Sequence, residues 1–315
     1  MCRRGNLHTP ETMRFAITGS TGLVGTALTR YLRQAGHDVT RVVRSYSSLP
    51  QAERAVVWNP DEGVIDAQGL ENHDVAIHLA GESIAGVWTP GKKRRIRESR
   101  VRGTTLLATT LARLTDRPSV LMAASAFDVY GDRPADETLV EDSPRGTGFL
   151  ADVSAAWEDS TQPATEAGIR VVNMRFATIL SPNGGMLGVL LPLYRLGLGA
   201  KIGDGRQYWP WIAIGDVPPA MMHIIDRPTI TGPVNFAAPQ AITNAEFTDT
   251  VAAVVGRPSF LSLPSFAARL APGGMSQELL LRGARVLPKK LIDSGYEFRH
   301  PELREALVGM LADGG

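Results

Sequence analysis

The stretch Thr18-Gly19-Ser20-Thr21-Gly22-Leu23-Val24-Gly25 decides the fold of this 315-residue chain. It follows an apolar run at residues 15–17, which predicts a buried strand, and it opens an apolar-periodic run at residues 23–34, which predicts a helix. Glycines at these three places permit a tight exit from the strand, close approach of the backbone to a pyrophosphate, and close packing of helix on strand. The helix N-terminus then directs its amides and its dipole toward the phosphates.

The context of this stretch predicts a dinucleotide-binding turn, because a further strand at residues 38–43 closes a βαβ unit. A purely structural glycine-rich turn is the alternative, which the spacing alone leaves open. The candidate cofactor-binding residues of the turn are Gly19, Thr21, Gly22, Leu23, Val24 and Gly25.

The end of the strand at residues 38–43 indicates which dinucleotide is bound. An acidic residue there would accept a hydrogen bond from the ribose 2′-hydroxyl, but the strand carries Arg41 and is followed by Arg44, with no carboxylate at its tip. Since a guanidinium forms forked, charge-assisted hydrogen bonds with phosphate, both arginines favour NADP over NAD. The alternative is that they are ordinary solvated charges at a strand end.

Strands alternate with helices over about 165 residues, a pattern typical of a doubly wound α/β sheet. We therefore expect a Rossmann-type parallel sheet at residues 13–180, to which some later segments return, and a smaller C-terminal substrate-capping region at residues 181–315. Besides the elements above, the pattern predicts strands at residues 55–58, 75–79, 120–124 and 170–176, and helices at residues 92–115, 152–167 and 245–255. The charges of the helix at residues 92–115 are interpreted as its solvated face.

Small residues follow the strand at residues 75–79. Doubly wound sheets bring their backbone against a bound nucleotide at this carboxyl end, so Leu79, Ala80 and Gly81 are candidate cofactor contacts. Glu82 is a candidate substrate contact, and His78 is interpreted as a packed strand residue.

The loop at residues 203–211 combines glycines, aromatic rings and an arginine, which suits a loop that closes over a polar ligand. Its candidate substrate residues are Arg206, Tyr208 and Trp209. A rigid packed turn is the alternative for Trp209 and for Trp211.

The composition favours small-molecule chemistry. The chain is 43% hydrophobic, enough for a full core, and its 33 basic and 32 acidic residues give a formal net charge of +1, which leaves no positive footprint for nucleic acid or membrane. The apolar stretch at residues 187–198 is interrupted by Pro192 and Arg195. A single cysteine, Cys2, excludes an intrachain disulfide, and residues 1–12 lack the apolar core of a secretory signal, so we expect the cytoplasm. We predict a small-molecule substrate and no metal site, and a homodimer stays open.

By these features the chain resembles the extended short-chain dehydrogenase/reductase superfamily of nucleotide-sugar epimerases, and within it the atypical epimerase-like group with a DUF1731 C-terminal region. The resemblance covers almost the whole chain. Beyond the glycine turn it rests on residues 125–131, 181–185, 203–207 followed by 211–212, and 233–307.

The resemblance implies a proton-transfer apparatus that this chain lacks. The superfamily places a Tyr, and a Lys four residues later, about 24 residues beyond a catalytic Ser. Counting from Ser125 leads to Phe149 and Val153, and neither carries a proton. Measured back from Tyr130, the catalytic Ser position falls on Ala126, which leaves Ser125 as the better hydroxyl candidate.

If the protein is an enzyme, another acid must transfer the proton, and the carboxylates nearest in sequence to the expected site are Asp128, Asp152, Glu158 and Glu82. The candidate catalytic residues are Ser125, Tyr130 and Asp128. Arg175, at the end of the strand at residues 170–176, is a candidate for holding an anionic group of the substrate, and it is also placed among the candidate cofactor-binding residues. A core ion pair is the alternative for Arg175.

The sequence is compatible with two functions. The first is an NADP-binding oxidoreductase acting on a small carbonyl or sugar-like substrate with a non-standard active site, since epimerising a nucleotide sugar would need the missing proton carrier. The second is a non-catalytic NADP-binding sensor or scaffold linked to cell division. The resemblance supports the second because plant relatives are associated with plastid division and bacterial ones have been likened to division inhibitors.

Overall fold

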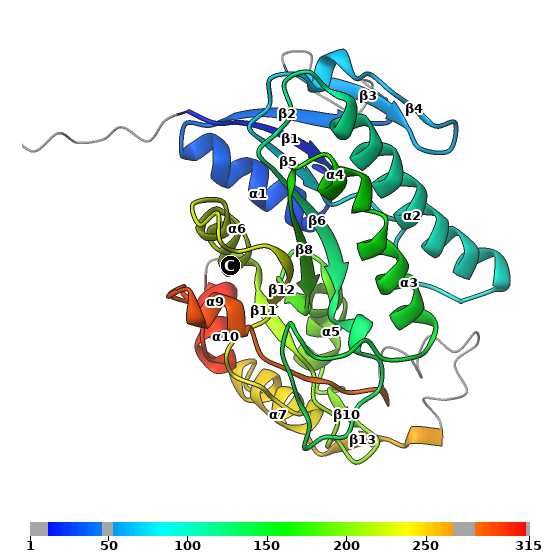
Figure 1. Ribbon diagram of the computed structural model, residues 1–315. Coiled ribbons are helices and arrows are strands. Elements are labelled where there is room, and N and C mark those ends of the chain that lie inside the picture. The colour runs from blue at the N-terminus through cyan, green and yellow to red at the C-terminus, as the bar shows by residue number, and fades with distance from the viewer. Residues whose placement is uncertain (1–11, 46–52, 267–280, 313–315) are drawn as a thin grey trace, which may run out of the picture.

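The computed structural model describes residues 12–45, 53–266 and 281–312 (Figure 1). Cys2, most of the segment at residues 1–12, and residues 267–280 of the C-terminal stretch lie outside the described residues. Within the part of the chain that is described, no helix is both long and apolar enough to cross a membrane.

An eight-stranded sheet forms the centre of the molecule, in the order β12-β8-β6-β5-β1-β2-β3-β4. Neighbouring strands are parallel except β3 and β4, which are antiparallel. The order reverses between β1 and β5, and doubly wound sheets bind ligands at the carboxyl ends of the strands at such a point. The predicted Rossmann-type α/β fold is confirmed. The strands are β1 (Arg14–Thr18), β2 (Asp38–Val43), β3 (Ala55–Asn59), β4 (Val64–Ile65), β5 (Val75–His78), β6 (Val120–Ala126), β8 (Arg170–Phe176) and β12 (Gly232–Phe236).

Helices cover both faces of this sheet (Figure 1). On one side α1 (Leu23–Gln34) packs with α6 (Val217–Ile225), and on the other α2 (Pro90–Arg113) packs with α3 (Phe149–Asp159) and α4 (Gln162–Glu166). Alternate residues of β1 serve the two faces: Phe15 packs in the cluster that contains Leu28 of α1, and Ala16 in the cluster that contains Leu107 of α2. The strands read as continuous apolar runs because both faces are covered.

The prediction of one helix at residues 152–167 is wrong in extent, because the structure has α3 and α4 there. The hydroxyls of Ser160 and Thr161 donate to the carbonyl oxygens of Ala156 and Glu158. Such side-chain bonds compete with the helical backbone. Pro163 then falls in the first turn of α4, where proline is tolerated.

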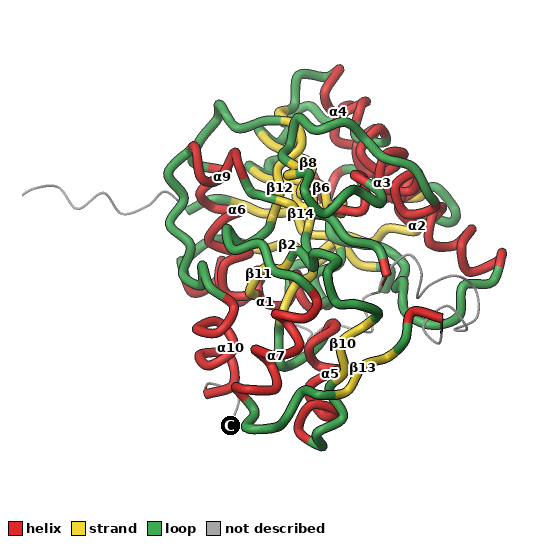
Figure 2. The backbone as a smooth tube through the Cα atoms, turned by 90° about the horizontal axis from the view of Figure 1, so that it is seen from below, coloured by secondary structure: helices red, strands yellow, loops and turns green. Residues whose placement is uncertain are grey.

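A second apolar cluster lies outside the large sheet. The helices that contribute to it lie together in Figure 2. The cluster includes Trp211, Phe247 and Leu307. The predicted capping box of Thr243 and Glu246 begins the helix at Asn244–Val254. We propose the division into residues 13–180 and 181–315 as the domain organisation, with β12 returning to the large sheet. The helices here are α5 (Gly185–Arg195), α7 (Asn244–Val254) and α10 (Leu303–Ala312), and the strand pairs are β9 (Thr178–Leu180) with β11 (Trp211–Ala213), and β10 (Ala200–Ile202) with β13 (Leu261–Leu263). A further strand pair joins β7 (Thr138–Leu139) to β14 (Arg285–Val286). The 3₁₀ turn η3 (Phe127–Tyr130) precedes β7 in the chain, and α9 (Lys289–Asp293) follows β14.

Candidate functional site

Two of the three glycines after β1 are required by the packing of the protein itself. Gly19 has φ +65°, and a Cβ there would lie 2.6 Å from the carbonyl carbon of Leu79, just after β5. A Cβ on Gly25 would lie 2.2 Å from the carbonyl oxygen of Gly19. A side chain at either position would therefore push the turn away from β5, or α1 away from the turn.

Gly22 differs, because no contact in the described part of the chain requires it to be glycine. Its φ is −74°, which any residue adopts, and the atom nearest to an added Cβ is 3.4 Å away. Gly22 is the N-cap of α1, where no side chain caps the helix and the first turn carries no acidic residue. The absent Cβ leaves the amides of the helix N-terminus open to an anion. The turn therefore fits the pyrophosphate of a dinucleotide.

A buried hydrogen bond joins β1 and β5 at their carboxyl ends. Thr18 Oγ1 lies 2.7 Å from His78 Nδ1, and it also accepts hydrogen bonds from the amides of Leu79 and Ala80 at 3.1 and 3.3 Å. Its own hydrogen therefore goes to Nδ1, which leaves the imidazole proton on Nε2. Burial lowers the pKa of His78 to about 4. His78 is thus a packed, neutral strand residue, and the predicted cofactor contacts Leu79, Ala80 and Gly81 lie beside the glycine turn.

The two arginines of β2 lie in different surroundings. Arg41 forms an ion pair with Glu53, with Nε 2.6 Å from Oε2, and Arg33 of α1 pairs with the same carboxylate at 3.0 Å. Arg44 is exposed one residue beyond β2, and the described residues give its side chain no hydrogen bond or ion pair. Arg44 is therefore the guanidinium available to a phosphate, whereas the charge of Arg41 is balanced. Sequence reasoning missed Glu53, which stands just before β3.

Arg175 forms a buried ion pair with Glu158. This is the core ion pair predicted as the alternative to ligand binding. Nε and Nη2 of Arg175 donate to the two carboxylate oxygens of Glu158 at 2.7 and 3.0 Å, and Nη1 donates to the carbonyl oxygen of Glu141 at 3.0 Å. Both side chains of the ion pair are at most 5% exposed. Because its donors are directed into the protein, we correct the assignment of Arg175 and remove it from the cofactor-binding residues.

Ser125 lies near the end of β6 and donates its hydroxyl hydrogen to Oε1 of Glu158 at 2.9 Å. The residue is 2% exposed. A hydroxyl has one hydrogen, so Ser125 does not donate to a substrate carbonyl while this bond persists. The geometry supports a structural role for Ser125, which links β6 to α3.

Tyr130 is fully buried at the end of η3. Its hydroxyl accepts a hydrogen bond from Arg175 at 2.9 Å and lies 2.9 Å from the carbonyl oxygen of Val140 and 2.8 Å from Oδ1 of Asn235. Burial raises the pKa of Tyr130 to about 12. A phenol enclosed in this way does not exchange a proton with a substrate near neutral pH, so the geometry supports a structural role in place of the catalytic one.

Asp128 is half-exposed on η3, and its charged neighbour is Arg100 of α2. Arg100 donates to the carbonyl oxygen of Glu82 at 3.0 Å, and its guanidinium lies 4.8 Å from the ring centroid of Trp157. Burial lowers the pKa of Arg100 to about 10, although the charge of Asp128 opposes this shift. Sequence reasoning missed Arg100 by assigning the charges of α2 to solvent. The available signal was its place four residues after the buried Ile96, on the inner face of the helix.

The predicted substrate residues do not come together in one place. Glu82 is half-exposed beside α2, whereas Arg206 and Tyr208 line a separate cavity. Trp209 is 7% exposed and packs against Phe247, with ring centroids 5.4 Å apart. The packed-turn interpretation therefore replaces substrate contact for Trp209.

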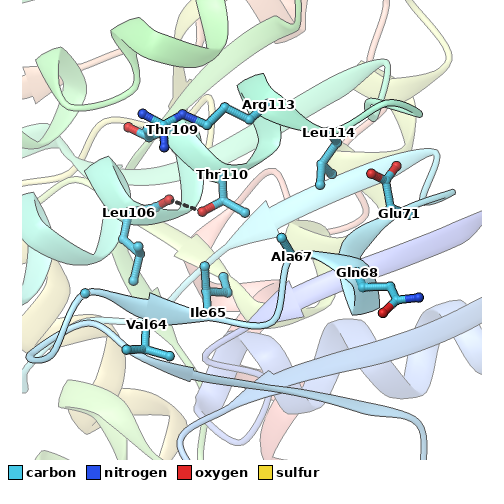
Figure 3. A pocket seen from close by; sticks show the side chains of 11 residues that line it. Val64, Ile65, Ala67, Gln68, Glu71, Leu106, Thr109, Thr110, Arg113 and Leu114 are labelled. Atoms are coloured by element: carbon cyan, nitrogen blue, oxygen red, sulfur yellow. Dashed lines mark hydrogen bonds between the residues drawn. The ribbon is translucent and has the colours of Figure 1, made fainter.

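A larger cavity of about 620 Å³ lies between β4 and α2 (Figure 3). Val64 and Ile65 line it from β4, and Leu106 and Leu114 line it from the side of α2. None of the predicted site residues lines this cavity.

The sheet with its switch point, and the glycine turn beside it, define a dinucleotide-binding α/β protein. Residues 15–236 match the model of the NAD dependent epimerase/dehydratase family, and the chain belongs to that family. Residues 263–308 match a domain of unknown function, DUF1731. The predicted resemblance is confirmed.

Among its relatives, the chain is 41% identical to an epimerase family protein of Mycobacterium bovis over 293 residues, which cover 93% of this chain and 95% of the relative. It also resembles the crystal structure of human epimerase family protein SDR39U1 (isoform 2) with NADPH, at 33% identity and a TM-score of 0.86, covering 96% of this chain and 100% of that one. UDP-glucose 4-epimerase of Thermotoga maritima, at 16% identity and a TM-score of 0.75 over 96% of this chain and 99% of that one, shares the fold alone.

Proposed function

We propose that the protein binds NADPH at the glycine turn and is an oxidoreductase acting on a small carbonyl or sugar-like compound. The observation that carries the proposal is Gly22, whose missing Cβ serves no contact within the described chain and opens the N-terminus of α1 to a pyrophosphate. The NADPH in the human SDR39U1 structure, which this chain resembles, supports the choice of cofactor. We keep the cytoplasm as the proposed location.

The residues present fit this cofactor at both of its anionic groups. The amides at the N-terminus of α1 would hold the pyrophosphate, and Arg44 would pair with the 2′-phosphate. Gly19 of the turn approaches the backbone of Leu79 and Ala80, just after β5, and Gly81 follows them in the chain. When bound, NADPH supplies a hydride to a carbonyl carbon.

Reduction of a carbonyl also requires a proton at its oxygen, and we assign that proton to Asp128. Ser125 and Tyr130 are turned into the protein, whereas Asp128 is half-exposed at the carboxyl end of β6. The charged neighbour of Asp128 is the guanidinium of Arg100. Once a substrate is found, Asp128→Asn should lower turnover about 100-fold while NADPH affinity stays within about twofold. Unchanged turnover in this variant would remove Asp128 from the mechanism.

The second candidate is a non-catalytic NADPH-binding sensor or scaffold. It is favoured by the hydrogen bonds that the Ser125 and Tyr130 hydroxyls make within the protein, because neither hydroxyl is then free to donate a proton to a substrate. Turnover of any compound in a panel of aldehydes, ketones and nucleotide sugars, lost in Asp128→Asn, would exclude it.

A fluorescence titration of the protein with NADPH and with NADH tests the cofactor assignment. We expect tighter binding of NADPH, and an affinity at least about tenfold weaker in Arg44→Ala, the loss expected for one charge-assisted contact. Arg54→Ala, which removes an exposed arginine at the start of β3, is the matched control and should bind as the wild type does. Absence of binding to either cofactor would discard the oxidoreductase proposal.

A further inference from the structure

A second cavity, of about 190 Å³, lies where three segments of the chain meet. Residues 132–135 and residues 206–208 line it, together with Leu281 and residues 283–285. Its charged lining residues are Asp132, Arg133, Arg206 and Arg285. Three guanidinium groups therefore line the cavity together with one carboxylate.

Backbone contacts hold these walls together. The amide of Arg133 donates to the carbonyl oxygen of Gly283 at 3.5 Å, and the amide of Ala284 donates to that of Tyr208 at 3.3 Å. A Cβ on Gly283 would lie 2.8 Å from the amide nitrogen of Tyr208, so the two segments approach as closely as glycine permits. The cavity is thus built by the fold rather than by exposed side chains alone.

The arginines differ in how far the protein satisfies them. Arg133 donates to the carbonyl oxygens of Tyr130 and Pro144 at 2.9 and 2.7 Å and lies 3.5 Å from Glu137. Its charge is therefore largely balanced.

Arg206 and Arg285 lack an anionic partner among the residues that the structure describes. Arg206 is exposed, and its side chain has no hydrogen bond or ion pair there. Arg285 stacks over Tyr208, with its guanidinium carbon 5.5 Å from the ring centroid, and its Nε is buried without a hydrogen-bond partner. The Nε–H group of Arg285 is therefore a donor that an anion in the cavity would satisfy.

We propose that this cavity binds the phosphate group of a small soluble phosphate monoester. Guanidinium groups match the oxygens of phosphate in forked, charge-assisted hydrogen bonds. The volume is below the roughly 300–1,000 Å³ of pockets that enclose a drug-sized ligand, so the cavity holds a phosphate and a few attached atoms. It shares no residue with the glycine turn or with Arg44, so the inference is independent of the proposed cofactor and reaction.

Calorimetric titration with inorganic phosphate, at an ionic strength held constant with chloride, tests the proposal. The titration is made on Arg44→Ala protein, so that phosphate attracted to the proposed cofactor site does not contribute. Adding Arg206→Ala or Arg285→Ala should weaken phosphate binding at least about tenfold, whereas adding the control Arg54→Ala should not. Glycerol 3-phosphate is the second probe and should displace inorganic phosphate.

If Arg285→Ala does not fold, Arg206→Ala decides the outcome, because Arg206 is exposed and its side chain has no hydrogen bond or ion pair to the described residues. Phosphate binding that is absent, or unchanged in Arg206→Ala, overturns the site. Failure of glycerol 3-phosphate to displace phosphate overturns the monoester assignment. NADPH affinity, measured in Arg206→Ala with Arg44 intact, should equal that of the wild type.

Discussion

Oε1 of Glu158 accepts hydrogen bonds from both the hydroxyl of Ser125 and Nε of Arg175, at 2.9 and 2.7 Å. One buried carboxylate oxygen of α3 therefore bonds to residues of both β6 and β8. Both residues lie near the carboxyl ends of their strands, the end of the sheet where we propose the reaction. This arrangement uses the serine closest to the family's catalytic position as a structural link.

Ser125→Ala should consequently have little effect on function. We expect NADPH affinity and any turnover to stay within about threefold of the wild type, whereas loss of a hydroxyl that acts in proton transfer would cost about 100-fold or more. The unfolding free energy should fall by about 1 kcal/mol, measured by urea denaturation. Arg175→Met is the contrast, because it leaves the charge of Glu158 buried without its main partner and should cost about 3–5 kcal/mol.

Tyr130→Phe tests whether the Tyr130 hydroxyl stabilises the fold or transfers a proton to the substrate. The hydroxyl receives a hydrogen bond from Arg175 and lies against Asn235, so its removal should lower the unfolding free energy by about 1–3 kcal/mol. Turnover should persist, because the phenol is buried and its pKa is raised to about 12. Thermal denaturation and steady-state assays of the same preparation check both parts. A stable variant without activity would restore Tyr130 as the proton carrier.

His78 should make the stability of the protein depend on pH. Its pKa falls from 6.5 in the unfolded chain to about 4 in the fold, so the unfolded state binds more protons between these values. The unfolding free energy should therefore rise by about 3 kcal/mol from pH 4 to pH 6.5 through this residue. Urea denaturation of wild type and His78→Gln across that range isolates the contribution, because other groups titrate in both. Identical slopes would show that His78 is not the cause.

Local sequence patterns were enough to predict the sheet and the glycine turn. The helix predicted at residues 23–34 coincides with α1, because its apolar period and the glycines before it agree with the fold they form. The same holds for the capping box of α7. Such features depend on neighbours along the chain, which the sequence displays.

The parts that could not be predicted depend on residues far apart in sequence. Tyr130 contacts Asn235, 105 positions later, and that contact encloses the hydroxyl. Arg206 and Arg285 come to one cavity from different segments, so Arg206 and Tyr208 appeared to belong with the substrate residues of a single loop. Neither spacing nor composition contains this information.

Whether the turn after β1 holds a dinucleotide is tested by the NADPH affinity of Gly22→Ala. The substitution is compatible with φ −74° and with the space around the position, so the unfolding free energy should stay within about 1 kcal/mol of the wild type. Gly25→Ala is the matched control for packing, because its Cβ collides with the turn and should destabilise the fold. We predict that Gly22→Ala folds but binds NADPH at least about tenfold more weakly, since the new methyl group occupies the approach of the pyrophosphate. A folded Gly22→Ala protein that binds NADPH as tightly as the wild type would show that the pyrophosphate does not lie against Gly22.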